Sequence, residues 1–323
     1  MSTSLSCTVS ARAALAGNPS DGHGGAVVAT VVPALAATVS FESDTHFGFT
    51  GSTARFASIT DVAEWVERGD FEGDQPLMQA ALTVLHRRLD ADLSPHDLRF
   101  VTTIPRSLGL AGSSAIVTAT ILAMIGSHQD DLWAHELVDR FELIPSLALE
   151  AERDVLGITA GLQDRVVQIF DGTVAMEFGP DHLRTDHGLD IGSYRRLGPL
   201  PDGMFVAYRD GTSQDSGLVH GSAATDSAAF QQAMERAATA ARAAADAIDR
   251  GDALALGRAM DATFDERAMA FDLDPAHVEM IEVARDAGAS ANYTGSGGSI
   301  VVLAPDNRAA DALRRIGCTI VAL

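Results

Sequence analysis

Apolar and polar residues alternate in the first third of the chain as half-buried strands require. The pattern predicts a strand over residues 6–15 and two β-rich segments that meet near Pro33 within residues 26–41. Short, threonine-rich pieces continue to Ser58 and predict a β-meander. Another strand is predicted over residues 98–104. The N-terminal part should therefore contain a sheet with antiparallel strands.

Apolar residues recur at helical spacing elsewhere. Residues 76–89 are a clear case, because Pro76 suits a helix start and leucines follow on one face. The other helices are predicted over residues 61–68, 132–143, 147–156, 230–249, 252–271 and 275–287, with further strands over 173–178 and 203–208 and in 292–303, before a last helix and strand. Helices mixed with strands in both halves predict the α+β class. The polar stretch 179–197 suggests a division near residue 185, into domains 1–185 and 186–323.

Residues 103–117 change within a few positions from strand to glycine turn to helix. Gly109 and Gly112 let the backbone approach an anion, and a helix that begins at Ser113 or Ser114 directs free N–H groups at the same point. No charged residue follows Arg106 until position 130, so this helix is predicted to be buried on nearly every side. The stretch suits a phosphate cradle; a plain strand-to-helix connection capped by Ser113 is the alternative.

Composition narrows the possible partners. The chain has 323 residues, 46% of them hydrophobic, which is ample for a packed core. A net charge of −21 disfavours nucleic acid and anionic membranes, and the apolar runs are too short to span a bilayer. The chain contains no lysine, so the cradle is not a Walker A motif and every fixed cation is an arginine. The chain has two cysteines, Cys7 and Cys318, which fits a reduced, cytoplasmic setting. We also expect the protein to be a monomer or a homodimer.

Three glycine-bearing motifs stand in order at residues 12–25, 105–115 and 292–299, with Ala151-Glu152 and residues 161–164 between them. This arrangement resembles the GHMP kinases, the family of galactokinase, homoserine kinase, mevalonate kinase and phosphomevalonate kinase, over nearly the whole chain. The resemblance implies a two-domain fold, with a ribosomal-protein-S5-like α/β N-terminal domain and a ferredoxin-like α+β C-terminal domain. It also implies ATP and Mg²⁺ as cofactors.

Within the family, the sequences of these motifs are most similar to those of the glucuronokinase branch. The similar segments are residues 15–21, 104–117, 160–166, 215–220 and 293–298. The resemblance implies phosphorylation of an anomeric hydroxyl, most specifically D-glucuronate to D-glucuronate 1-phosphate. One position departs, because Leu218 stands where that branch carries a lysine, although an arginine elsewhere could supply the charge. Galacturonate, a heptose or a neutral hexose therefore stays open as the acceptor. A non-catalytic binding protein and a nucleotide-dependent decarboxylase of the same fold are remoter alternatives.

The resemblance also implies residue roles. Asp164 would accept the hydroxyl proton or orient the hydroxyl, and Arg12 would stabilise the developing charge. Ser114 and Glu152 would contact Mg²⁺. The nucleotide would lie on Leu108, Gly109, Leu110, Ala111, Gly112, Ser113 and Ser114. Substrate contacts are expected from Asn18, Asp21, Gly295, Gly297 and Gly298, and more weakly from Asp215, Ser216 and His220.

Each role has a structural alternative. Glu152 and Arg12 could be surface residues, and His220 could be structural. Asn18, Asp21 and the three glycines could simply form turns.

Overall fold

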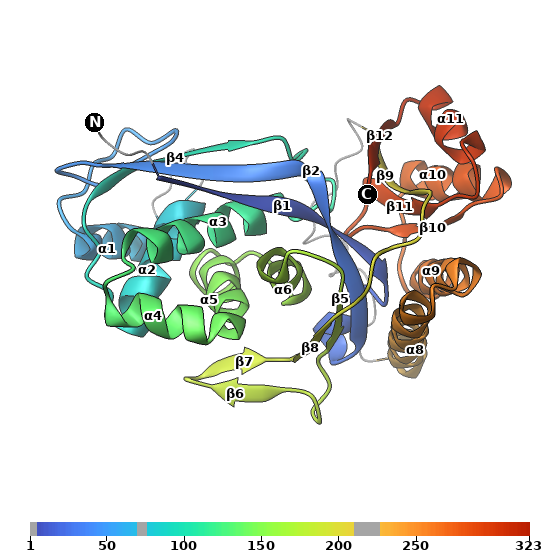
Figure 1. The fold of residues 1–323 in the computed structure, drawn as a ribbon, viewed down its shortest axis with the longest axis horizontal. Coiled ribbons are helices and arrows are strands. Elements are labelled where there is room, and N and C mark those ends of the chain that lie inside the picture. The colour runs from blue at the N-terminus through green and yellow to red at the C-terminus, as the bar shows by residue number, and fades with distance from the viewer. Residues whose placement is uncertain (1–4, 70–75, 210–226) are drawn as a thin grey trace.

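The computed structural model describes residues 5–69, 76–209 and 227–323 (Figure 1). Its first half is built on a sheet with the strand order β3-β4-β2-β5-β8, in which β1 also pairs with β2. The strands are β1 (Leu5–Ala16), β2 (Ala26–Ser43), β3 (Gly48–Phe49), β4 (His96–Thr102), β5 (Val174–Glu177) and β8 (Ser193–Arg196). All pairs are antiparallel except β3 with β4, which confirms the sheet predicted for this part.

β2 is one long strand, and the prediction of two segments around Pro33 was wrong. The register with β1 shifts between Ser10 and Ala11, so residues 33–35 of β2 bulge out of the pairing. Pro33 lies in this bulge, where its missing N–H removes no ladder hydrogen bond. The two ends of β2 then pair with different strands, β4 and β5. The predicted meander up to Ser58 is reduced to β3 and one isolated bridge.

Helices pack against one face of this sheet (Figure 1). They are α1 (Ile59–Arg68), α2 (Leu77–Leu89), α3 (Gly112–Ser127), α4 (Leu132–Asp139), α5 (Ile144–Glu150) and α6 (Gln163–Phe170). α3 and α6 contact β1 and β2 directly, while α2 and α5 pack on α3. The main apolar core lies between these helices and the sheet, and α3 is buried nearly all round, as its lack of charge predicted.

The second half has an antiparallel sheet in the order β10-β11-β9-β12. Its strands are β9 (Met204–Tyr208), β10 (Ser290–Tyr293), β11 (Ser299–Leu303) and β12 (Thr319–Ala322). The helices are α8 (Ala228–Arg250), α9 (Ala253–Ala270), α10 (Pro275–Asp286) and α11 (Arg308–Arg315). α8 packs on α9 and also on β1 and β2, so it joins the two halves.

Two segments differ from the sequence prediction. The helix predicted over residues 147–156 is α5 followed by a π-helical turn (Ala151–Val155). The stretch expected to be irregular contains a hairpin of β6 (Arg184–Asp186) and β7 (Leu189–Ile191), followed by β8 of the first sheet. The proposed division near residue 185 falls inside β6 and stays a prediction.

Candidate active site

Segments from both halves of the chain surround one cavity of about 810 Å³. The first half contributes the loop after β1, the turn before α3, the π-helical turn and the start of α6. The second half contributes α9 and the loop between β10 and β11. All of these segments except α9 carry residues that the sequence analysis assigned to the site.

The turn before α3 has the backbone of an anion cradle. α3 begins at Gly112, slightly earlier than predicted, and its N-cap residue Ala111 has a φ of 60°. Among the described residues no side chain caps this helix, so the alternative in which Ser113 caps it does not apply. The N–H groups of the first turn are therefore available to a ligand in the cavity, at the positive end of the helix dipole.

The loop between β10 and β11 packs directly on this turn. A Cβ at Gly295 would lie 2.4 Å from the Gly109 carbonyl oxygen, so only glycine allows the approach. Thr294 Oγ1 donates a hydrogen bond to the same carbonyl at 3.1 Å, and Ser299 Oγ donates one to the Leu108 carbonyl at 2.5 Å. This contact between loops requires Gly295 whether or not a phosphate or sugar also approaches it.

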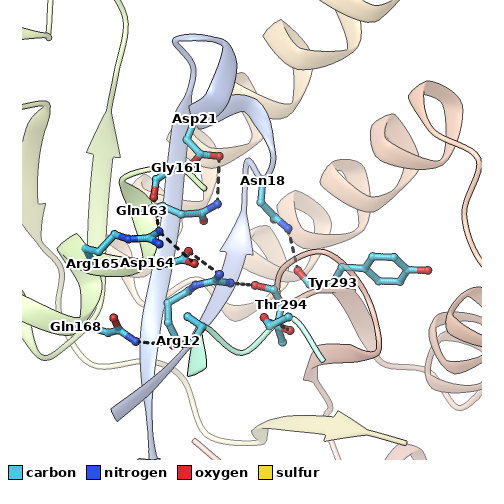
Figure 2. A network of polar contacts seen from close by, with 12 residues as sticks. Arg12, Asn18, Asp21, Gly161, Gln163, Asp164, Arg165, Gln168, Tyr293 and Thr294 are labelled. Carbon is cyan, nitrogen blue, oxygen red and sulfur yellow. Dashed lines mark hydrogen bonds and ion pairs between the residues drawn. The ribbon is translucent and has the colours of Figure 1, made fainter. Parts of the chain in front are cut away.

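Arg12 on β1 and Asp164 on α6 form an ion pair that lines the cavity (Figure 2). Arg12 Nη2 lies 2.5 Å from Asp164 Oδ1, and Arg12 Nη1 donates to the Thr294 carbonyl. The backbone N–H of Arg12 donates to the Leu110 carbonyl at 3.2 Å. Arg12 is only 4% exposed and Asp164 is 19% exposed, so the guanidinium is fixed while the carboxylate stays accessible. Arg12 is therefore not a surface arginine.

A second ion pair, between Arg165 and Glu152, is fully buried. Arg165 also donates to the Gly161 carbonyl at 2.6 Å and approaches Asp164 Oδ2 at 3.7 Å, so the two pairs form one network (Figure 2). Glu152 lies on the π-helical turn, a kind of distortion that often occurs at functional sites. Its Oε2 accepts from Arg165, whereas its Oε1 has no hydrogen-bond partner among the described residues. Glu152 is thus not a solvated surface residue.

Ser114 and Glu152 fit a Mg²⁺ ion that has few protein ligands. Both line the cavity, and α3 contacts the π-helical turn. The unpartnered Glu152 Oε1 and the Ser114 hydroxyl are hard oxygen donors of the kind that Mg²⁺ prefers. The described part of the chain has no cluster of three or more His, Cys, Asp and Glu side chains that could hold a metal. This donor set suits an ion that keeps waters and binds with the phosphates of a nucleotide.

Asp21, in the loop after β1, is a carboxyl whose surroundings raise its pKa well above the ordinary value. Burial, and next the negative charge of Asp164, raise its pKa to about 6 against the opposing charge of Arg12. Gln163 Nε2 donates to Asp21 Oδ1 at 3.1 Å (Figure 2). Asp21 therefore combines a directional contact with a half-buried place on the cavity wall.

Asn18 lines the same cavity but uses its amide within the chain. It donates to the Tyr293 carbonyl at 3.1 Å and accepts from Asn292 at 3.0 Å. Its side chain is almost fully buried. These contacts tie the first loop to β10 and favour the structural alternative for Asn18.

Comparison with known proteins assigns a family to this arrangement. The family model described as the GHMP kinases N terminal domain matches residues 76–172, and the model described as GHMP kinases C terminal matches residues 244–320. This chain belongs to the GHMP kinase family. Glucuronokinase 1 of Arabidopsis thaliana is 31% identical over 92% of this chain and 84% of the relative, and Probable glucuronokinase 2 is 32% identical over 92% and 83%. The crystal structure of the Methanococcus jannaschii mevalonate kinase superposes with a TM-score of 0.73 at 13% identity, covering 99% of this chain and 97% of that one.

The GHMP kinase assignment confirms the resemblance stated from the motifs and the two-domain α+β fold. A kinase family implies ATP as the phosphoryl donor. None of the helices in the described segments has both the length and the apolar character needed to cross a membrane.

The predicted substrate contacts of this GHMP kinase at residues 215–220 and 295–298 stay predictions. Asp215, Ser216, Leu218 and His220 lie outside the described residues, so their roles stay predictions. Ser296 and Gly295 line the cavity, whereas Gly297 and Gly298 follow in the same loop with φ values of 135° and 80° that favour glycine. Turn formation and loop packing thus account for these glycines, and their contact with substrate stays a prediction.

Among the cavity-wall residues that sequence reasoning missed is a buried cation, Arg267 on α9. The available signal was its spacing, because Arg267 continues the buried face formed by Leu256, Met260 and Thr263. A charged residue at an apolar position of a helix is unusual and could have been noticed. The pairing of Arg165 with Glu152 was also not predicted.

Proposed function

We propose that this GHMP kinase transfers the γ-phosphoryl group of ATP to the anomeric hydroxyl of a sugar acid, giving D-glucuronate 1-phosphate from D-glucuronate. The observation that carries the proposal is the similarity to Glucuronokinase 1, which extends over 92% of the chain. The geometry supports it, because a phosphate cradle, an accessible carboxylate and a fixed guanidinium border one cavity.

Different residues have different roles in phosphoryl transfer. The backbone of residues 108–114 holds the phosphates at the start of α3. Asp164 orients the acceptor hydroxyl and takes its proton as the new P–O bond forms, while ADP leaves. Arg12, held against Asp164, neutralises the charge that develops on the transferred group.

Mg²⁺ would be held by Ser114 and by Glu152 Oε1. When bound, it neutralises charge on the β- and γ-phosphate oxygens. Arg165 keeps Glu152 in place by binding its other oxygen. Asp21, held by Gln163, is placed to accept hydrogen bonds from sugar hydroxyls.

A sugar panel with ATP and Mg²⁺ tests the proposal. D-glucuronate, D-galacturonate, a heptose and D-glucose are each incubated with the protein, and ADP release and the phosphorylated product are measured. The Asp164→Asn protein serves as the inactive control. We expect product from D-glucuronate, with phosphorus coupled to the anomeric carbon and proton in NMR spectra. ADP release with another sugar alone, or with none, would refute the substrate assignment.

A further inference from the structure

Arg267 is a buried cation on the wall of the cavity. It belongs to α9, which carries none of the sequence motifs, its side chain is 2% exposed, and it lines the cavity. Its guanidinium carbon lies 5.1 Å from the ring centre of Tyr293 and 5.7 Å from that of Phe271. Among the described residues its one hydrogen bond is a long contact of 3.5 Å from Nη2 to the Ser296 carbonyl, and Nε has no partner there.

The other arginines of the cavity wall differ from Arg267. Arg12 is paired with Asp164, and Arg165 with Glu152. Arg106 is exposed to solvent on the turn before α3. Within the described segments, Arg267 is thus the buried arginine of this wall that no carboxylate neutralises.

A buried arginine without a carboxylate partner lowers the stability of the fold unless a ligand supplies the missing negative charge. Burial lowers the pKa of Arg267 to about 10, against the opposing negative charge of Asp21, and this pKa leaves Arg267 protonated at neutral pH. Cation–π contacts recover only part of the solvation that a buried guanidinium loses. An apolar side chain would meet the packing needs of α9 at this position at least as well. The charge is therefore better explained by a negatively charged ligand than by the fold.

The surroundings favour a sugar acid over a polyphosphate as that ligand. The aromatic ring of Phe271 lines the cavity beside Arg267, and such a wall suits the apolar face of a sugar ring. Asp21 lies close enough to influence the guanidinium, and its carboxyl can accept hydrogen bonds from the hydroxyl groups that a sugar acid carries and a polyphosphate lacks. The phosphates already have the cradle at the start of α3.

We propose that Arg267 binds the carboxylate of the acceptor sugar and selects sugar acids over neutral sugars. This rests on the proposed function and makes it specific, because it names the cation that recognises the acid. A planar guanidinium can hold a carboxylate through two parallel hydrogen bonds, which fixes the orientation of the ring as well as its charge. The glucuronokinase branch carries a lysine where this chain has Leu218, and Arg267 would supply the missing positive charge from α9.

The test compares D-glucuronate with its neutral amide, D-glucuronamide, as acceptors for three proteins. Arg267→Met removes the charge and keeps an unbranched apolar chain, whereas Arg267→Lys keeps the charge but loses the planar fork. Arg258→Gln is the matched control, because Arg258 is an exposed arginine on the same helix and lies away from the cavity.

For Arg267→Met we expect the KM for D-glucuronate to rise about 10- to 100-fold, the usual effect of losing hydrogen bonds to a charged group. The KM for ATP and the turnover of D-glucuronamide should change little, so the preference for the acid disappears. Arg267→Lys should retain part of the preference, and Arg258→Gln should behave like the wild type. The thermal unfolding midpoint of Arg267→Met should be at least as high as that of the wild type, because a buried charge has been removed.

Two results would overturn the proposal while leaving the proposed function standing. One is an Arg267→Met protein that keeps the wild-type preference for D-glucuronate over D-glucuronamide. The other is an equal fall in turnover for both acceptors together with a higher KM for ATP, which would place Arg267 at the transferred phosphate. A wild-type protein that phosphorylates only neutral sugars would instead overturn the proposed function, and this inference with it.

Discussion

Replacement of Asp164 by asparagine gives the most informative test of the site. The amide keeps the size of the side chain and much of its hydrogen bonding, but it carries no negative charge and is not a base. We expect turnover to fall about 10²- to 10⁴-fold, the usual contribution of a positioned acid or base. The KM for ATP should change little, because the backbone of residues 108–114 holds the phosphates.

The structure also predicts a cost in stability. Arg12 is 4% exposed, and in Asp164→Asn it would face only neutral acceptors, the asparagine amide oxygen and the Thr294 carbonyl, in place of a carboxylate. Removing one partner of a buried ion pair costs about 3–5 kcal/mol. Asp164 is 19% exposed on the cavity wall, so water can replace part of the lost interaction. We therefore expect the free energy of unfolding to fall by about 1–3 kcal/mol.

The assay measures kcat, both KM values and the free energy of unfolding on the same preparation. Glu177→Gln is the control, because Glu177 binds Arg242 through two hydrogen bonds of 2.7 and 2.8 Å outside the cavity. Arg242 is 52% exposed, so this variant should lose less than about 1 kcal/mol and keep full turnover.

Full activity of Asp164→Asn would refute the catalytic assignment, together with the placement of the acceptor hydroxyl beside this loop. A loss of turnover no greater than the fraction of unfolded protein would show that Asp164 is structural. In either case the Arg12 pair would serve the fold alone.

Three more substitutions test neighbouring parts of the site. Ser114→Ala should raise the Mg²⁺ concentration needed for half-maximal rate roughly 10-fold with no change in stability, and unchanged kinetics at limiting Mg²⁺ would remove Ser114 from the metal site. Glu152→Gln should cost about 3–5 kcal/mol of unfolding free energy, because the buried Arg165 loses its close carboxylate and keeps only Asp164 at 3.7 Å. Glu152→Gln with Arg165→Met should recover most of this loss, and simple additivity would contradict the pair. The pKa of Asp21 is about 6 in the folded protein, compared with an ordinary value of 3.8. As pH rises from about 4 to 6, the unfolded chain has released this proton while the folded protein still holds it, so the free energy of unfolding falls over this range. Asp21→Asn should therefore be more stable than the wild type by about 1–3 kcal/mol at pH 7.5 and equal to it near pH 3.5, and an equal difference at both pH values would show another cause.

The sequence by itself determined the local conformations and their order. The charge-free stretch after Arg106 predicted a buried helix, and the glycines before it predicted the turn that the structure shows. These features depend on neighbouring residues, through backbone sterics and the burial of a helix face. The three glycine motifs, together with Ala151-Glu152 and residues 161–164 between them, were enough to identify the family, because each constrains a short segment independently of the others.

Only the tertiary structure decided which side chains meet. The pairing of Glu152 with Arg165 depends on a π-helical turn that no local pattern predicted. The need for glycine at position 295 comes from the Gly109 carbonyl, which the fold brings within 2.4 Å of its ideal Cβ. Arg267 reaches the cavity because α9 packs beside β10 and next to the first loop of the other half. Long-range contacts of this kind depend on how whole elements pack, and packing depends on the shape of every surface in contact rather than on the spacing of residues along one segment.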